Sequence, residues 1–174
     1  MSLLDGWKFC PRCAAPIRRE PGRAECDACG FVAYANSAPT VSAVLVDGEG
    51  RVLLARRAVE PDLGKWDLPG GFLEEGEEPL AGLRRELREE TGLEVEPLSF
   101  LGAWVDTYGE DEGAVSTLNL YWLARAAGEP NAADDVAELQ WFGADELPEL
   151  AFRANAAVLE AWQRAAAPPA SKHS

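Results

Sequence analysis

Residues 70–93 constrain this chain more than any other part of it, because they combine clear helix boundaries with a crowded set of acids. Pro79 suits the first helical position, and Gly92 suits the left-handed residue that follows a last turn. We therefore expect a helix over residues 79–91. At about 100° per residue, one narrow face must pack on a core. That face carries Leu80, Leu83, Leu87 and Thr91.

An adjoining face of the same helix carries three carboxylates, Glu86, Glu89 and Glu90. The arginines of this segment fall on the other flank, so we expect no i, i+4 partner to neutralise these acids on their own stripe. Crowded carboxylates repel one another and attract a cation. Hard oxygen ligands suit Mg²⁺ or Mn²⁺. Charge alone would equally allow a solvated acidic face.

The spacing of the specified residues favours the metal site. Nine positions over 23 residues read Gly71, five residues, Glu77, seven residues, Arg-Glu-Leu, one residue, Glu-Glu, one residue and Gly-Leu. This pattern resembles the signature of the Nudix hydrolases. Such a long pattern is far more specific than a short glycine motif. The resemblance covers residues 38–166.

The resemblance implies an α/β fold, the Nudix-type α/β/α sandwich with a mixed sheet, and the order of expected elements agrees. Residues 40–46 and 51–57 read as two strands joined by a turn at Asp47-Gly48, which predicts a hairpin. Residues 33–39 read as a linker. A helix is expected near the end, over residues 152–166. The tail, residues 167–174, is expected to be disordered, and the single histidine, His173, lies in it.

Nudix hydrolases cleave a pyrophosphate within a nucleoside diphosphate that is linked to another group. By motif position, the implied ligands of the catalytic Mg²⁺ or Mn²⁺ are Glu86, Glu89, Glu90 and the carbonyl of Gly71. Arg85 and Glu77 would hold the loop and orient these carboxylates.

The base that deprotonates the attacking water stays open at this point. Glu86 and Glu90 are candidates on the helix, whereas Asp135, Glu138 and the acids at 110–112 are candidates on downstream loops. Nucleobases are recognised by stacking on aromatic side chains, but a β-rich core also uses Trp and Tyr for its packing. The available aromatic residues are Tyr34, Trp104, Tyr108 and Trp122, of which Trp104 and Tyr108 are our substrate-binding candidates.

All four cysteines lie in the first thirty residues, as two Cys-x-x-Cys pairs separated by twelve residues: Cys10, Cys13, Cys26 and Cys29. Two such pairs close a tetrahedral S₄ site, so residues 1–35 are predicted to form a small zinc ribbon. Iron in the same cage and disulfides are the alternatives, and a reducing compartment disfavours the second. A closed Zn²⁺ site would stabilise the segment and take no part in catalysis.

A formal charge of -14 argues against attraction to nucleic acids or anionic membranes. The resemblance to the Nudix hydrolases implies a small nucleoside diphosphate derivative as the partner. No run reaches the length of a membrane helix, and the first residues lack the apolar core of a signal peptide. We expect a cytoplasmic protein. Similar enzymes are frequently homodimers, so a homodimer is a further expectation.

A zinc ribbon placed before a Nudix domain resembles the NADH pyrophosphatases. Their Ser-Gln-Pro-Trp segment is missing, because the corresponding region reads Leu101-Gly102-Ala103-Trp104. ADP-ribose or an NAD-type dinucleotide is the favoured substrate, with nucleotide sugars and oxidised nucleoside triphosphates open. Two other classes compete: a nucleotide-sensing regulator without hydrolysis, and an interaction module built on the ribbon. The intact set of carboxylates disfavours the first.

Overall fold

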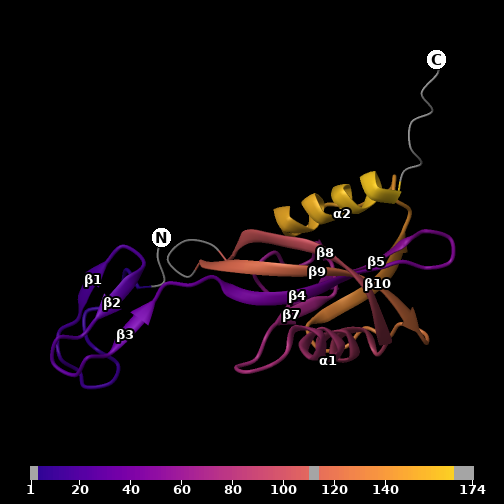
Figure 1. The fold of residues 1–174 in the computed structure, drawn as a ribbon. Helices are drawn as coiled ribbons and strands as arrows, with labels where there is room; N and C mark the ends of the chain where they lie inside the picture. The colour runs from indigo at the N-terminus through magenta and orange to yellow at the C-terminus, as the bar shows by residue number, and fades with distance from the viewer. Residues whose placement is uncertain (1–3, 110–113, 167–174) are drawn as a thin grey trace, which may run out of the picture.

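A computed structural model of the chain describes residues 4–109 and 114–166. The acids at 110–112 and the tail that contains His173 lie outside the described residues. A small β unit forms the N-terminal end, and the larger body places one helix on each side of its strands (Figure 1).

The N-terminal unit is a three-stranded antiparallel sheet in the order β1–β2–β3. Its strands are Arg18–Glu20 (β1), Arg23–Glu25 (β2) and Val32–Tyr34 (β3). Ala24 and Cys26 are fully buried in it. Four residues of the expected linker belong to strands, Ala33 and Tyr34 to β3 and Ala38 and Pro39 to β4, so the connection to the body is shorter than expected.

The body contains a four-stranded mixed sheet in the order β7–β4–β9–β8. Its strands are Ala38–Leu45 (β4), Gly70–Phe72 (β7), Glu94–Tyr108 (β8) and Val115–Ala127 (β9). Strand β4 runs parallel to β9, and the other neighbours are antiparallel. The expectation of a mixed sheet is confirmed.

A second, three-stranded sheet has the order β10–β5–β6. It consists of Val52–Arg57 (β5), Trp66–Asp67 (β6) and Val136–Phe142 (β10). The predicted hairpin is therefore wrong: past a single bridge between Val46 and Val52, the strand β5 leaves β4 and pairs with β10. Four consecutive residues of β5 are buried, so both of its faces need a packed layer, which a two-stranded hairpin cannot provide.

Helix α1 spans Pro79–Thr91, which confirms the prediction from sequence at both ends. Gly92 has φ 67° and donates its N–H to the carbonyl of Arg88, as a left-handed helix stop requires. Leu83 and Leu87 are fully buried, whereas Leu80 is 39% exposed. The predicted burial of Leu80 is wrong, because the helix meets the core one turn after its start.

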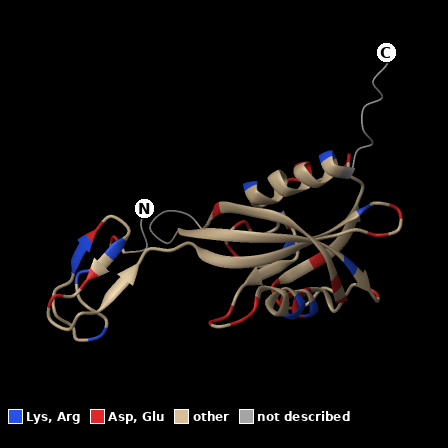
Figure 2. Cartoon of the chain, viewed as in Figure 1, with Lys and Arg blue, Asp and Glu red and all other residues tan. Residues whose placement is uncertain are grey.

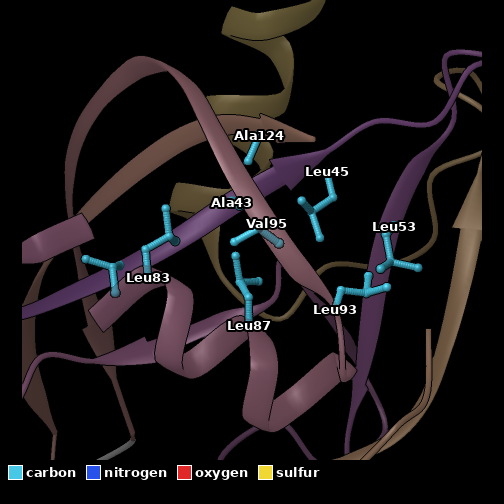
Figure 3. Packing of buried hydrophobic residues seen from close by; sticks show 9 residues of the cluster. Ala43, Leu45, Leu53, Leu83, Leu87, Leu93, Val95 and Ala124 are labelled. Carbon is cyan, nitrogen blue, oxygen red and sulfur yellow. The ribbon is translucent and has the colours of Figure 1, made fainter. Parts of the chain in front are cut away.

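The core has two parts, one under each helix. Under α1, a cluster joins Leu83 and Leu87 to β4, β5, β8 and β9 (Figure 3): Val41, Ala43, Leu45, Leu53, Leu93, Val95 and Ala124. Helix α2, Arg153–Ala166, covers the other part through Ala154, Val158 and Leu159. This arrangement is the expected α/β/α sandwich. Among the described residues, no helix is both long enough and apolar enough to cross a lipid bilayer.

Candidate active site

Helix α1 and the glycines of β7 hold the acidic group together. Acidic residues lie in the loop that leads into α1, and α1 itself carries both acidic and basic residues (Figure 2). Glu90 is only 8% exposed, and one of its carboxylate oxygens accepts the N–H of Gly70 at 2.8 Å. Burial raises the pKa of Glu90 well above its usual value, the hydrogen bond from Gly70 opposes this, and the charges of Asp135, Asp67 and Glu86 add to it. An ionised Glu90 thus needs a compensating positive charge.

Glu86 lies directly against the backbone of Gly71. A Cβ at Gly71 would meet the Glu86 carboxylate at 2.4 Å, so only glycine allows this close approach. Burial raises the pKa of Glu86, Arg85 lowers it, and the charges of Glu89 and Asp135 raise it further. The structure therefore brings Glu86, Glu90 and Asp135 within electrostatic reach of one another.

Arg85 connects most of the motif. Its guanidinium donates to both carboxylate oxygens of Glu77, at 2.9 and 2.8 Å, to Glu86 at 2.8 Å and to Glu89 at 3.1 Å. It also donates to the carbonyl of Phe72 at 3.1 Å. The expectation that no i, i+4 partner neutralises these acids is therefore wrong for Glu89, since Arg85 pairs with it four residues on. The hydrogen bond from Arg85, helped by the N–H of Glu74, lowers the pKa of Glu77 to about 2.

Glu86 and Glu90 carry the oxygen donors that a hard divalent cation takes, but among the described residues no three carboxylates bring their oxygens within 4.8 Å of one another. Glu90 has no cationic partner among the contacts described for it, and three carboxylates raise its pKa. Oxygen donors of this kind are those that Mg²⁺ and Mn²⁺ take. Asp135 joins this group. Glu138 does not, because it pairs with Arg56 at 3.5 Å, where both side chains are half exposed.

A pocket opens next to the carboxylates, with an empty volume of about 460 Å³ including its mouth. Its lining comes from β4 to β9 and the start of α2: Thr40, Ser42, Arg57, Asp67, Leu68, Gly70, Gly71, Phe72, Asp106, Tyr108, Thr117, Asn119, Tyr121, Phe152 and Asn155. Since Gly70 and Gly71 also contact Glu90 and Glu86, the pocket and the acidic group share one wall.

Of the four candidate aromatic residues, only Tyr108 lines this pocket. Trp104 instead packs edge-on against Tyr121, with ring centroids 5.6 Å apart, in the core under α2. Trp122 packs with Phe100, and Tyr34 is exposed on β3 of the N-terminal unit.

Sequence reasoning missed the polar lining of the pocket. Arg57 donates to Asp67 at 3.0 Å, to the carbonyl of Pro61 at 2.7 Å and to the hydroxyl of Tyr108 at 3.3 Å. Asp67 also accepts a hydrogen bond from Asn155. Burial raises the pKa of Asp67, and Arg57 lowers it. The available signal was two arginines at the end of one apolar strand segment, Leu-Leu-Ala-Arg-Arg, and an aspartate inside another, Trp-Asp-Leu.

The four cysteines form a second, separate ligand set. Their sulfurs all lie within 4.8 Å of one another, the only such ligand group found among residues 4–109 and 114–166. All four are free thiols, with Cys10 and Cys29 sulfurs 3.7 Å apart and Cys13 and Cys26 sulfurs 3.6 Å apart. Each Cys-x-x-Cys segment forms a tight turn. The N–H of Ala14 donates to the carbonyl of Cys10, and the N–H of Gly30 donates to the carbonyl of Cys26. Four clustered thiols fit a tetrahedral zinc ion, as in a zinc ribbon.

The sandwich fold, the glycine loop and the acidic helix together define a phosphoanhydride hydrolase of the Nudix class. The chain belongs to the Nudix family: a sequence profile described as the NUDIX domain matches residues 36–163. It is thus a Nudix pyrophosphohydrolase. A solved Nudix hydrolase from Nitrosomonas europaea superimposes with a TM-score of 0.74 at 28% identity, covering 91% of this chain and 93% of that one.

Similar proteins carry different substrate names. An ADP-ribose pyrophosphatase of Methanocaldococcus jannaschii is 38% identical over 63% of this chain and 67% of its own length. A putative 8-oxo-dGTP diphosphatase of Mycobacterium tuberculosis is 43% identical over 57% of this chain and 69% of its own. The NAD-capped RNA hydrolase NudC of Vibrio atlanticus is 27% identical over 86% of this chain, which spans only 54% of that protein.

Proposed function

We propose that this Nudix hydrolase cleaves the pyrophosphate bond of a nucleoside diphosphate derivative, with ADP-ribose or an NAD-type dinucleotide favoured. The observation that carries the proposal is the buried carboxylate of Glu90, held by the Gly70 N–H beside the pocket that Gly70 and Gly71 line. The names of two similar proteins, an ADP-ribose pyrophosphatase and an NAD-capped RNA hydrolase, support the substrate class.

In this proposal Glu86, Glu89, Glu90 and the carbonyl of Gly71 hold Mg²⁺ or Mn²⁺. When bound, such an ion neutralises the diphosphate charge and lowers the pKa of a water. Arg85 and Glu77 orient the carboxylates, because the Arg85 guanidinium contacts Glu77, Glu86 and Glu89 at once. The four cysteines hold a structural Zn²⁺, and their free thiols suit a reducing cytoplasm.

Three acids are candidates to accept the proton of the attacking water: Glu86, Glu90 and Asp135. Burial is the main cause that raises the pKa values of Glu86 and Glu90 in the absence of an ion. Asp135 lies within electrostatic reach of both. Glu138 is a weaker candidate because Arg56 holds it at the surface.

A substrate panel tests the proposal. The full-length protein is incubated with ADP-ribose, NAD⁺, NADH, nucleotide sugars and 8-oxo-dGTP, with Mg²⁺ or Mn²⁺. Phosphate release is followed in the presence of a phosphatase. We expect metal-dependent turnover, highest with ADP-ribose or an NAD-type dinucleotide. Turnover restricted to nucleoside triphosphates would reject the substrate class, and no metal-dependent turnover of any compound would reject the activity.

A further inference from the structure

Strands β8 and β9 carry an apolar face that helix α1 covers only in part. The helix has 13 residues and is about 20 Å long, whereas the two strands have 15 and 13 residues and span about 40 Å or more. Both strands therefore extend past the helix towards the N-terminal unit (Figure 1). The apolar face consists of three pairs of residues that lie directly opposite each other: Val105 with Leu118, Ala103 with Leu120, and Phe100 with Trp122.

The side chains of this apolar face are open to solvent, although they lie on the helix side of the sheet. Leu120 and Trp122 pack against the cluster under α1, which places all three pairs on that side. Ala103 is exposed at the centre of the face. The larger exposed fractions are 67% for Val105, 54% for Phe100 and 36% for Leu118.

Helix α1 adds Leu80 to the apolar face. The flank of α1 that carries Glu86 and Glu90 faces β7, since both carboxylates contact its glycines. Strands β7 and β9 lie on opposite sides of β4, so the other flank of α1 borders β9. At about 100° per residue, Leu80 lies on that second flank, on the far side of Leu83 from Glu86, and it is 39% exposed. The apolar face and the acidic group therefore lie on opposite flanks of α1.

The charge of the molecule favours a second copy of this chain as the occupant. The formal net charge is -14, yet none of the residues that form the apolar face is charged. A nucleic acid or a charged peptide would find no ion-pair partner there. Two copies of so acidic a chain repel each other over most of their surface, and they approach with least repulsion through a neutral face. The edge of β8 is a poorer contact, because register shifts at 97–99 and 100–102 interrupt it.

The area of the apolar face also suits a pair of identical faces. The exposed fractions of Leu80, Phe100, Val105 and Leu118 correspond to about two whole side chains, or about 350 Å² of apolar surface per copy. A patch of this size on a monomer is often functional. Two such patches, together with the polar rim that usually surrounds them, bury about 1,200 Å², which is the lower limit for a stable, specific interface.

We propose that two copies of this chain form a dimer by packing their apolar faces together around a two-fold axis. An axis that crosses the strands at Ala103 places the Phe100 ring opposite Val105 of the partner subunit. Trp122 then lies opposite Leu118 of the partner subunit. Large rings thus meet smaller side chains, and Ala103 leaves room at the centre. Because the acidic group lies on the other flank of α1, the active site stays open in the dimer.

Sedimentation of the full-length protein over a wide range of concentrations tests the proposal. The wild type should form a dimer that dissociates on dilution. Val105→Lys should raise the Kd of the dimer about 100-fold or more, because each copy places an ammonium group in an apolar contact. The added lysine lowers the net negative charge, so greater overall repulsion cannot explain the loss. Ser99→Lys is the matched control, because Ser99 is exposed on β8 opposite Leu123, which packs under α2.

A second variant changes the same face from another element. Leu80→Lys, on α1, should also weaken the dimer, and a thermal melt of each variant distinguishes dissociation from unfolding. A wild type that stays monomeric at every concentration would overturn the proposal. A dimer that tolerates both Val105→Lys and Leu80→Lys, or that Ser99→Lys weakens equally, would overturn it too. Sedimentation requires no turnover, so its result is independent of the proposed function.

Discussion

At the scale of single residues, the site depends on glutamates in different environments. Glu90 is buried with a backbone N–H as its hydrogen-bond partner, whereas Glu77 is held by both arms of the Arg85 guanidinium. Burial favours the protonated form of a carboxyl, and an arginine favours the ionised form. In the proposed site the same residue type therefore has two tasks: Glu90 binds a cation, and Glu77 helps to orient its neighbours.

Glu90→Gln and Glu89→Gln should each reduce metal-dependent turnover by about 100-fold or more, because each removes a charged ligand for the ion. The melting temperature should not fall in Glu90→Gln, since the change removes a costly buried charge. Addition of Mg²⁺ should raise the melting temperature of the wild type, and it should raise that of the two variants by a smaller amount. Glu96→Gln, on an exposed position of β8, is the control. Near-normal turnover in either variant would contradict the assignment.

Glu77→Gln should lower stability in a manner that depends on pH. The folded pKa of Glu77 is about 2, below the ordinary value of 4.5, so its ionised form stabilises the folded state above pH 4.5. This contribution is lost as the pH falls towards 2. Urea unfolding of both proteins at pH 7, 5, 4 and 3 should show a stability difference that narrows below pH 4.5. Glu75→Gln, exposed in the same loop, is the control, and a constant difference would count against the pair.

At the scale of elements, the site depends on the close contact between β7 and helix α1, where Gly71 leaves room for the Glu86 carboxylate. The helix bounds and the acidic face could be predicted because capping residues and periodicity are local signals. The Arg57–Asp67 pair and Phe152 could not, because the pocket forms only when β5, β6, β8 and the start of α2 meet. The hairpin prediction failed for a related reason: a local turn signal does not reveal that the next strand joins another sheet.

Gly71→Ala should lower turnover without lowering the thermal stability of the fold. A methyl group at Gly71 would meet the Glu86 carboxylate at 2.4 Å and displace it, so turnover should fall about 100-fold. Gly48→Ala is a matched control, because nothing lies within 4 Å of its added Cβ. Thermal melts should be similar for both. Equal turnover in the two variants would show that the Glu86 position tolerates movement.

At the scale of the whole molecule, the chain combines two units with separate sources of stability. The body buries two apolar clusters, one under each helix, whereas the three-stranded N-terminal unit buries little beyond Leu4, Cys10, Ala24 and Cys26. So small a unit needs a metal or another link to hold its fold. The cysteine spacing predicted this unit from sequence, because its contacts are local.

Cys10→Ser should lose the metal of the N-terminal unit and leave the body folded. Elemental analysis should find about one zinc per wild-type chain and clearly less in the variant. Limited proteolysis should then cut within residues 1–35, while turnover stays within about 2-fold, since a closed zinc site takes no part in catalysis. Ser2→Ala is the control. Full zinc content in Cys10→Ser would contradict the four-cysteine site.

The parallel pairing of β4 with β9 has a consequence for how the protein is made. Val41 lies opposite Leu120, so β4 can pair with β9 only after the chain has been synthesised through residues 115–127. Contacts of such long sequence separation form slowly, whereas the cysteine turns close within thirty residues. On the ribosome, the metal-binding unit can therefore fold first, and the hydrolase body waits for β9 to emerge.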